Sequence, residues 1–321
     1  MLSRVADSLY WMSRYLERAE HTARLIDVNL NLALDQSPRA EESRWPLVLY
    51  SLQLGLDEDD HDAFTVARYL TIDPKNSSSI LACVAGAREN ARQVRGQISS
   101  EMWEQLNRFY LTVRNADFDR MWQRQPYEFF RSIKEGIHFF QGTTDSTMNH
   151  GEGWYFIQLG RYIERAVATT TLLDFHYRTY LSSPDNTVEE TGDYLEWVGL
   201  LKSCTAFEAF TKVYTADLLQ PDLVAEFLVL NPEFPHSVRF AVDMIQASLQ
   251  GIAGATAPRP GGKVNRLSGR LHAALSYSHV DELMADDIHA YLLDVRQRCA
   301  EIHTAIYETY VAYPFEMAVT L

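Results

Sequence analysis

Apolar residues recur every three to four positions along most of the chain, and polar residues fill the positions between them. This spacing is typical of amphipathic helices, and no segment shows the strict apolar–polar alternation of a strand pair. Asp73-Pro74 and Asn231-Pro232 end helices, because the residue before a proline avoids the helical conformation. The pattern predicts an all-α fold, with helices at about 4–34, 43–54, 61–71, 77–96, 100–114, 126–141, 147–181, 190–215, 220–229, 234–251, 265–277 and 281–312.

One stretch of the sequence occurs twice. Residues 14–27 read RYLERAEHTARLID and residues 161–174 read RYIERAVATTTLLD, so that eight of the fourteen positions are identical. Further matches follow in the same order: RWPLVLYS aligns with EWVGLLKS, and VARYLTIDP aligns with VAEFLVLNP. Repeated segments that keep their order over this length predict a tandem duplication of one helical unit.

The predicted repeats cover residues 1–145 and 146–321. Neither repeat could cover its own apolar helix faces, and stacking one repeat on the other would supply the missing cover. We therefore expect a tandem-duplicated helical bundle in which two halves, related by a pseudo-twofold axis, form one continuous compact body.

Composition narrows the possible partners. The 321 residues are 46% hydrophobic and 22% charged, with a formal net charge of −14. This charge repels nucleic-acid phosphates and anionic membrane surfaces, so we expect neither as a partner. Three scattered cysteines without a CxxC pair are typical of free thiols in a reducing compartment. No signal peptide or membrane span is evident, and a cytoplasmic location is expected.

The repeated Glu-Arg dipeptide shares its helix face with apolar residues such as Ile157 and Leu172, which predicts a helix that is covered on all sides. A buried glutamate needs a hydrogen-bonded partner, and arginine offers five donors. Two interpretations follow. The charges form an internal ion-pair network between the repeats, or they border a cleft that binds a carboxylate, a phosphate or a peptide terminus. The candidate charged site comprises Arg14, Glu17, Arg18, Arg161, Glu164 and Arg165.

A second candidate segment is AGARENARQVRGQ, which places several arginines on one helical stripe. Like charges at this spacing repel each other unless carboxylates or a ligand neutralise them. The second repeat lacks the pattern. This is expected if one half alone kept a ligand site, and equally if the sequence of an exposed surface changed without constraint. The candidate ligand-binding residues are Arg88, Glu89, Asn90 and Arg92.

Metal binding is a third possibility, because Glu135 and His138, like Asp286 and His289, have the spacing of carboxylate–histidine ligand pairs. Together with the two motif glutamates they would match the ligand count of a di-metal four-helix bundle. The arginines beside both glutamates compete with a cation for the carboxylates, so we expect neither a metal nor a cofactor. No phosphate loop, nucleophile elbow or zinc motif is present, and no catalytic residue can be assigned.

The two motifs RYLERA and RYIERA, with the flanking segments DSTMNHGEGWYFIQLG, ARENARQVR, WEQLN and LSGRLHAAL, resemble the alpha-E family over essentially the whole chain. This is a bacterial, all-helical family named for its ER motif and typically found as a duplication. Its motif residues correspond to the two candidate sites named above. One difference is His236, which stands where the family pattern leads us to expect arginine.

The resemblance implies a biosynthetic setting, since family members occur beside circularly permuted ATP-grasp ligases and transglutaminase-like proteases. We therefore expect an accessory, non-catalytic component of a peptide synthesis or modification system, with those two proteins as partners and a peptide or amino-acid-derived ligand. An enzyme that acts on an amide or peptide in a charged cleft through Glu17 or Glu164 is the alternative, and the di-metal bundle is the third hypothesis.

Overall fold

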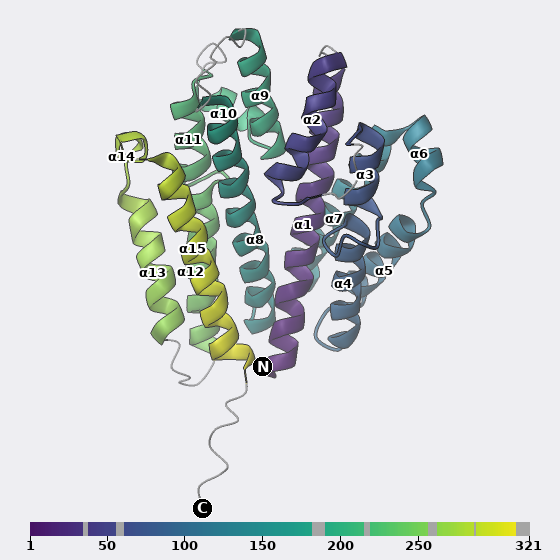
Figure 1. The fold of residues 1–321 in the computed structure, drawn as a ribbon. Helices are drawn as coiled ribbons and strands as arrows, with labels where there is room; N and C mark the ends of the chain where they lie inside the picture. Colours follow the sequence, from purple (N-terminus) through teal and green to yellow (C-terminus); the bar gives the residue numbers. More distant parts are fainter. Residues whose placement is uncertain are drawn as a thin grey trace, which may run out of the picture.

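The protein is described by a computed structural model over residues 1–34, 38–55, 61–181, 190–214, 219–255, 262–285 and 287–312. Every regular element in these ranges is helical, which confirms the predicted all-α fold (Figure 1). The helices of the first half are α1 (Ser3–Ala33), α2 (Pro38–Ser51), α3 (Ala63–Thr71), α4 (Ile80–Gln93), α5 (Ser100–Arg114), α6 (Phe118–Arg124) and α7 (Pro126–Thr147).

The second half has a comparable order. It comprises α8 (Glu152–His176), which ends in the π-helical turn η1 (Tyr177–Leu181), and then α9 (Glu190–Ser203), α10 (Phe207–Val213), α11 (Pro221–Leu230), α12 (Val238–Ala255), α13 (Gly262–Tyr277), α14 (Val280–Ala285) and α15 (Ile288–Ile306), which ends in η3 (Tyr307–Val311). None of the helices in the described ranges is long and apolar enough to cross a membrane.

Helices α1 and α8 carry the two copies of the motif and lie side by side at the centre of the molecule (Figure 1). They run in the same direction, since the amino group of Met1 binds Glu152 at 2.8 Å and the motifs meet further along both helices. Their closest approach is at Gly160, where a Cβ atom would lie 2.2 Å from the carbonyl oxygen of Tyr10. Only glycine lets the two backbones come this close.

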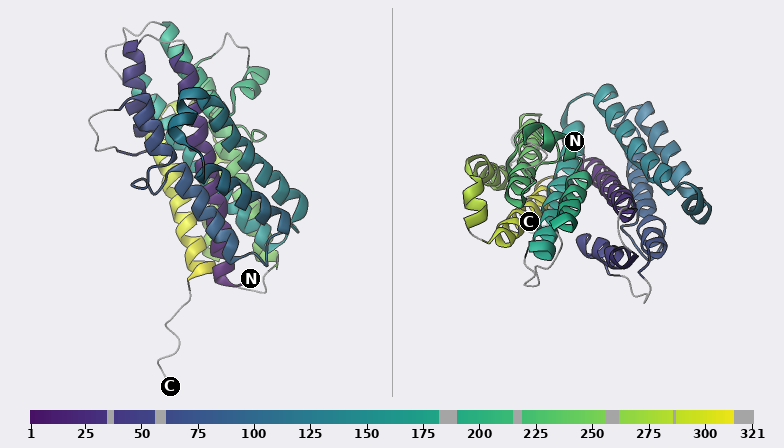
Figure 2. Two further views of the ribbon diagram at one scale, coloured as in Figure 1. Left: turned by 90° about the vertical axis from the view of Figure 1, so that its right-hand side faces the viewer. Right: turned by 90° about the horizontal axis from the view of Figure 1, so that it is seen from above.

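The remaining helices flank this pair on opposite sides (Figures 1 and 2). Helix α1 packs against α4 and α7, while α8 packs against α12 and α15. In the same way, α4 packs on α5 as α12 packs on α13. A duplication would produce this matched order, and the duplication itself stays a prediction from the sequence. The expected repeat boundary after residue 145 falls in the last turn of α7.

Several predicted helix bounds were wrong, mainly around turns. Residues 142–147 belong to α7, and α8 begins only at Glu152. The helix expected over 190–215 is broken after Ser203, where Thr205 adopts a left-handed conformation with φ of 55°. The short helix α6 was not predicted, because seven residues are too few to show a periodicity.

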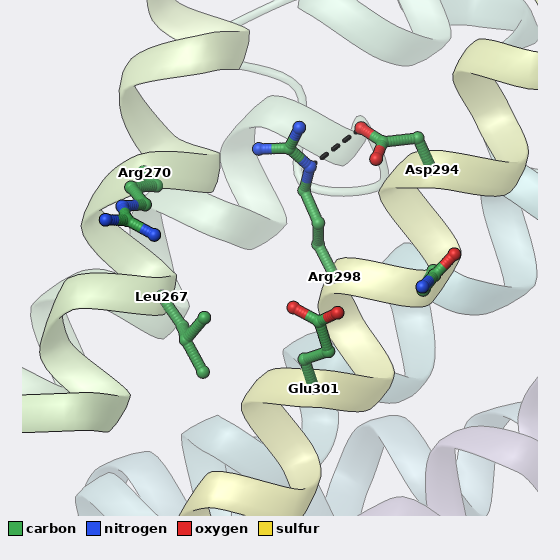
Figure 3. A pocket seen from close by; sticks show the side chains of 6 residues that line it. Leu267, Arg270, Asp294, Arg298 and Glu301 are labelled. Carbon is green, nitrogen blue, oxygen red and sulfur yellow. Dashed lines mark hydrogen bonds and ion pairs between the residues drawn. The ribbon is translucent and has the colours of Figure 1, made fainter.

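The outer helices α13 and α15 enclose a pocket of about 260 Å³ between them (Figure 3). Arg298 donates to Asp294 at 2.7 Å in this pocket, and Arg270 faces the pair from α13. Its walls are mostly charged side chains with high exposure, which water solvates well. The pocket is therefore a surface groove far from the central motif helices.

Candidate functional site

Glu164 on α8 is the centre of the first ion-pair cluster. Its Oε2 accepts a hydrogen bond from Nε of Arg14 at 2.8 Å, and its Oε1 accepts one from Nε of Arg18 at 2.7 Å. Both arginines come from α1, one helical turn apart. The guanidinium of Arg14 also lies over the ring of Trp11, 4.7 Å from its centroid. Two cations therefore hold one carboxylate between the central helices.

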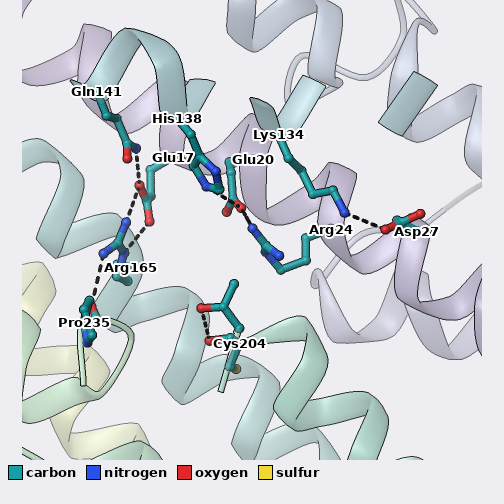
Figure 4. Close-up of polar contacts among 11 residues, drawn as sticks. Glu17, Glu20, Arg24, Asp27, Lys134, His138, Gln141, Arg165, Cys204 and Pro235 are labelled. Atoms are coloured by element: carbon teal, nitrogen blue, oxygen red, sulfur yellow. Dashed lines mark hydrogen bonds and ion pairs between the residues drawn. The ribbon is translucent and has the colours of Figure 1, made fainter. Parts of the chain in front are cut away.

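Glu17 on α1 is the centre of the second cluster (Figure 4). Arg165 on α8 donates to its Oε1 at 2.5 Å and to its Oε2 at 3.0 Å, in the bidentate fork geometry that favours arginine. Gln141 on α7 adds a third donor at 3.3 Å. Another nitrogen of Arg165 donates to the carbonyl of Pro235 at 3.1 Å. Glu17 is thus well supplied with donors.

The two clusters cross between the helices, because each motif glutamate is bound by arginine from the other copy of the motif. Glu17 meets Arg165 as Glu164 meets Arg18, and these are corresponding positions of the repeat. Arg161 breaks the correspondence with Arg14, since its nearest carboxylate is Asp145 at 4.0 Å. The structure therefore brings five of the six candidate residues into two clusters and leaves Arg161 outside them.

The electrostatics of both clusters favour charged side chains. Burial alone would raise the pKa of Glu164, but the charges and hydrogen bonds of Arg14 and Arg18 outweigh it and hold this pKa below its usual range. Burial would lower the pKa of Arg165, but the adjacent Glu17 carboxylate raises it. Both shifts favour the charged forms of Glu164 and Arg165.

A pocket of about 230 Å³ opens beside Glu164 and Arg18. We call it the Glu164 pocket. It is lined by residues of both central helices, by residues 51–54 at the end of α2 and just after it, and by Ser78 before α4. The side chain of Arg18 is 29% exposed here, against 9% for Arg165. This cluster therefore borders a cleft.

A corresponding cavity beside Glu17 and Arg165 has a volume of only about 10 Å³, and we call it the Glu17 cavity. Its wall includes Cys204 and His236, which take the places of Leu52 and Ser78 in the repeat alignment. Burial lowers the pKa of His236 well below its usual range, so the ring is neutral there. This cluster is therefore part of the core, and the two clusters have different surroundings.

A polar seam between α1 and α7 continues the second cluster and was not anticipated from the sequence (Figure 4). Lys134 donates to Asp27 at 2.5 Å, and His138 contacts Glu20 at 3.5 Å. The matching motif residue Asp174 accepts from Arg296 of α15 at 2.7 Å. The identity of Asp27 and Asp174 in the repeat could have revealed this role, because each anchors the last long helix of its half.

The candidate residues of the AGARENARQVRGQ segment lie apart from both clusters, on α4. Arg92 and Glu89 form an exposed pair at 2.7 Å, and this hydrogen-bonded pairing lowers the pKa of Glu89 to about 2. Arg88 instead turns to α5, where its Nε donates to Asn107 at 2.8 Å. Asn90 is half-buried on the same helix. Arg88 and Arg92 therefore take different partners, and the ligand-binding role of these four residues stays a prediction.

The proposed di-metal ligands are also separated. His138 contacts Glu20 rather than Glu17, and the exposed Glu135 contacts Arg131 at 3.9 Å. His289 is bound to Asp174 at 2.6 Å, and Asp286 lies outside the described residues. Over the described parts of the chain, no group of three or more His, Cys, Asp or Glu side chains could hold a metal ion.

Comparison with known proteins finds relatives of undefined role. An uncharacterised protein of Mycobacterium bovis is 25% identical, and one of Mycobacterium tuberculosis strain H37Rv is 24% identical. In both cases the match covers 94% of this chain but only 35% of the relative, so the chain spans about a third of their length. No solved structure matches the chain.

A family model matches residues 1–311, nearly the whole chain, and describes a predicted α-helical domain with a conserved ER motif. The Glu-Arg dipeptides of that motif are the residues that cross between α1 and α8 in both clusters. The chain belongs to the Alpha-E family.

Proposed function

We propose that the protein is a binding component of a peptide synthesis or modification system, working with a circularly permuted ATP-grasp ligase and a transglutaminase-like protease. We further propose that the Glu164 pocket receives the ligand. The observation that carries this proposal is the difference between the two clusters, since one borders an open pocket of about 230 Å³ and the other is sealed.

The chemistry of the Glu164 pocket fits a small carboxylate or amide. Arg18 uses its Nε for Glu164, and within the described residues its two Nη groups have no protein acceptor. They remain able to bind an oxygen atom of a ligand. Leu52, Leu54 and Val167 add apolar surface to the wall, beside polar side chains such as Thr22 and Ser78. An amino-acid-derived or short peptide ligand combines both features.

The size of the pocket agrees with such a ligand. Its volume of about 230 Å³ equals the space of roughly eight water molecules, at about 30 Å³ each. This is room for one amino-acid residue or a small modified peptide end. The net charge of −14 argues against a polyanion.

The alternative of an enzyme that uses Glu17 or Glu164 as acid–base has less support. Such a group needs a carboxylate with a raised pKa in a pocket that water can reach. Glu17 is 3% exposed and faces a cavity too small for a substrate. Glu164 reaches a pocket, but its two arginines shift its pKa in the opposite direction. Binding is the role that the geometry favours.

The test combines association with pocket blockage. The full chain is mixed with a circularly permuted ATP-grasp ligase, and co-purification and ATP-dependent ligation are measured. Thr171→Phe should fill the pocket and lower ligation or ligand binding at least tenfold, with association intact. Thr304→Phe, on the exposed side of α15, is the matched control. Failure of the two proteins to associate, with no effect of either variant on ligation, would reject the proposal.

A further inference from the structure

A row of alternating arginine and aromatic side chains lies where α4 and the turn after it pack on α5. Arg88 stands between two rings, with its guanidinium carbon 5.5 Å from the centroid of Trp103 and 4.9 Å from that of Tyr110. Arg95 covers the same Trp103 ring at 5.4 Å, and Arg114 covers the Tyr110 ring at 5.9 Å. We call these five residues the arginine row.

The packing against aromatic rings holds the guanidinium groups in place but leaves their charge unmatched. A guanidinium over a ring face keeps the N–H edges free for hydrogen bonds. Over the described residues, none of the three arginines of the row has a carboxylate within 4.0 Å, whereas the neighbouring Arg92 is paired with Glu89. Arg95 and Arg114 are also exposed. Arg88 donates its Nε to Asn107, and within the described residues the row has no carboxylate partner, so it is an ordered cationic strip.

We propose that the arginine row is a docking surface for an acidic, extended segment of a partner protein. Carboxylates form bidentate pairs with guanidinium groups, and apolar stems of the segment can lie on the rings. Arg88 lies on α4 and Arg95 lies in the turn that follows it. Both guanidinium carbons are within 5.5 Å of the Trp103 ring centroid, so they are no more than about 11 Å apart. An extended polyproline-II segment places every third residue on one side at about 9 Å. Acidic residues three apart would match the row.

A peptide fits this surface better than a nucleic acid does. The protein as a whole carries a charge of −14, and a polyanion with a charge at every phosphate would meet that repulsion around a strip of only three cations. A short acidic segment presents fewer charges and confines them to the strip. The surface is also separate from the Glu164 pocket, whose lining includes none of the row.

The experiment titrates the full chain with a fluorescein-labelled, proline-rich peptide of twelve residues that has glutamate at every third position. The control peptide has glutamine at the same positions, and binding is followed by fluorescence anisotropy at low and moderate salt. We expect saturable, salt-sensitive binding of the glutamate peptide alone. The double variant Arg88→Gln, Arg95→Gln should weaken it at least tenfold. Arg131→Gln, an exposed arginine on α7, is the control and should bind as the unchanged chain does.

Three outcomes would overturn the proposal: no binding of the glutamate peptide, equal binding by the double variant and the control, or tighter binding of a labelled single-stranded oligonucleotide. The circular dichroism spectrum and thermal unfolding of the double variant establish that it is folded, and Arg95→Gln alone provides a milder change at an exposed residue. Thr171→Phe should leave peptide binding unchanged. Loss of the Glu164 pocket and loss of the arginine row are thereby distinguishable.

Discussion

The charged residues of the two central clusters differ in how far water can reach them, and this difference decides what each contributes. Arg165 is buried against Glu17, and the carbonyl of Pro235 fixes its third contact. Arg18 shares Glu164 with Arg14 and is partly exposed in the pocket. Arg165 is therefore essential to the buried carboxylate of Glu17. Arg18 can be replaced in part by Arg14, which also binds Glu164.

The first prediction follows from this difference. Arg165→Met should lower the free energy of unfolding by about 3–5 kcal/mol, because it leaves Glu17 as an uncompensated buried charge. Arg18→Met should lower it by about 1 kcal/mol or less, because Arg14 still binds Glu164 and water screens the site. Urea unfolding of both variants measures the two values. Equal losses would contradict the distinction between core and cleft.

The second prediction concerns pH. Burial lowers the pKa of His21, His176 and His236, so the folded protein keeps these rings neutral while the unfolded chain takes up protons near pH 6.5. The unfolded state then binds more protons, and the free energy of unfolding should fall as the pH drops below about 6.5. The paired carboxylates Glu20 and Glu164, whose pKa is lowered, add a second loss below about pH 4.5.

Urea unfolding at about pH 8, 6 and 5 checks this dependence. The variant His236→Gln should lose less free energy of unfolding between pH 8 and pH 5 than the unchanged chain does. His150→Gln, which changes an exposed ring, is the matched control and should leave the loss as it is in the unchanged chain. A free energy of unfolding that stays constant over this range would contradict the prediction.

At the scale of elements, the contact between α1 and α8 depends on one glycine. A side chain at residue 160 would meet the backbone of Tyr10, which cannot move without displacing the helix. Both Glu–Arg clusters lie one turn further along the same pair of helices. The close approach of the backbones at Gly160 therefore fixes the spacing between α1 and α8 that the glutamate and arginine side chains of both clusters must span.

The third prediction compares two glycines in helices. Gly160→Ala should lower the free energy of unfolding by about 1–3 kcal/mol or more, because the added methyl forces the central helices apart. Gly142→Ala on α7 has open space around it and should raise the value by about 0.5–1 kcal/mol, since alanine favours the helix. Thermal or urea unfolding measures both changes. A stabilising Gly160→Ala would show that the helices can separate at no cost.

The ends of α2 and α9 share an unusual backbone. Gln53 has a φ of 57° and Thr205 a φ of 55°, and these are corresponding positions of the repeat. Each conformation lets the next amide bond back to its helix, from Leu54 to Leu49 and from Ala206 to Leu201. Glycine is the usual residue at such a left-handed helix end. After the turn at Gln53, Leu54 lines the Glu164 pocket. After the turn at Thr205, Ala206 is buried in the core.

A fourth prediction tests this strain. A left-handed conformation costs an L-residue about 1–2 kcal/mol, and the cost is high for a β-branched side chain. Thr205→Gly should remove it and raise the free energy of unfolding by roughly 0.5–1 kcal/mol after the larger entropy of the unfolded glycine chain is counted. Thr211→Gly, within α10, serves as the control and should lower the value. A destabilised Thr205→Gly protein would show that the turn is not strained.

At the scale of the whole molecule, corresponding positions of the two halves meet each other across the centre. Gly160 faces Ser13, its counterpart in the repeat, and Arg44 binds Glu196 at 2.5 Å. The second pair also occupies matching positions of RWPLVLYS and EWVGLLKS. A twofold relation would place like against like on its axis. Arg44 and Glu196 carry opposite charges, so this contact between the two halves is attractive.

The sequence predicted the helical fold and the burial of the motif glutamates, because apolar residues on every side of a charged position require a covered helix. It could not choose between core and cleft. That choice depends on segments that arrive from distant parts of the chain: residues 51–54 and Ser78 on one side, and Cys204 and His236 on the other. The seam from Lys134 to Asp27 was missed for the same reason.

The filling of the Glu17 cavity by His236 has a consequence for the number of ligands that one chain can hold. The corresponding residue of the Glu164 pocket is the small Ser78. If the Glu164 pocket binds its ligand as proposed, His236→Ser should open a second position beside Glu17, and calorimetric titration with that ligand should give two per chain in the variant and one in the unchanged protein. A single bound ligand in the folded variant would contradict this. In the proposed binding role, the side chain of His236 would occupy the second ligand position.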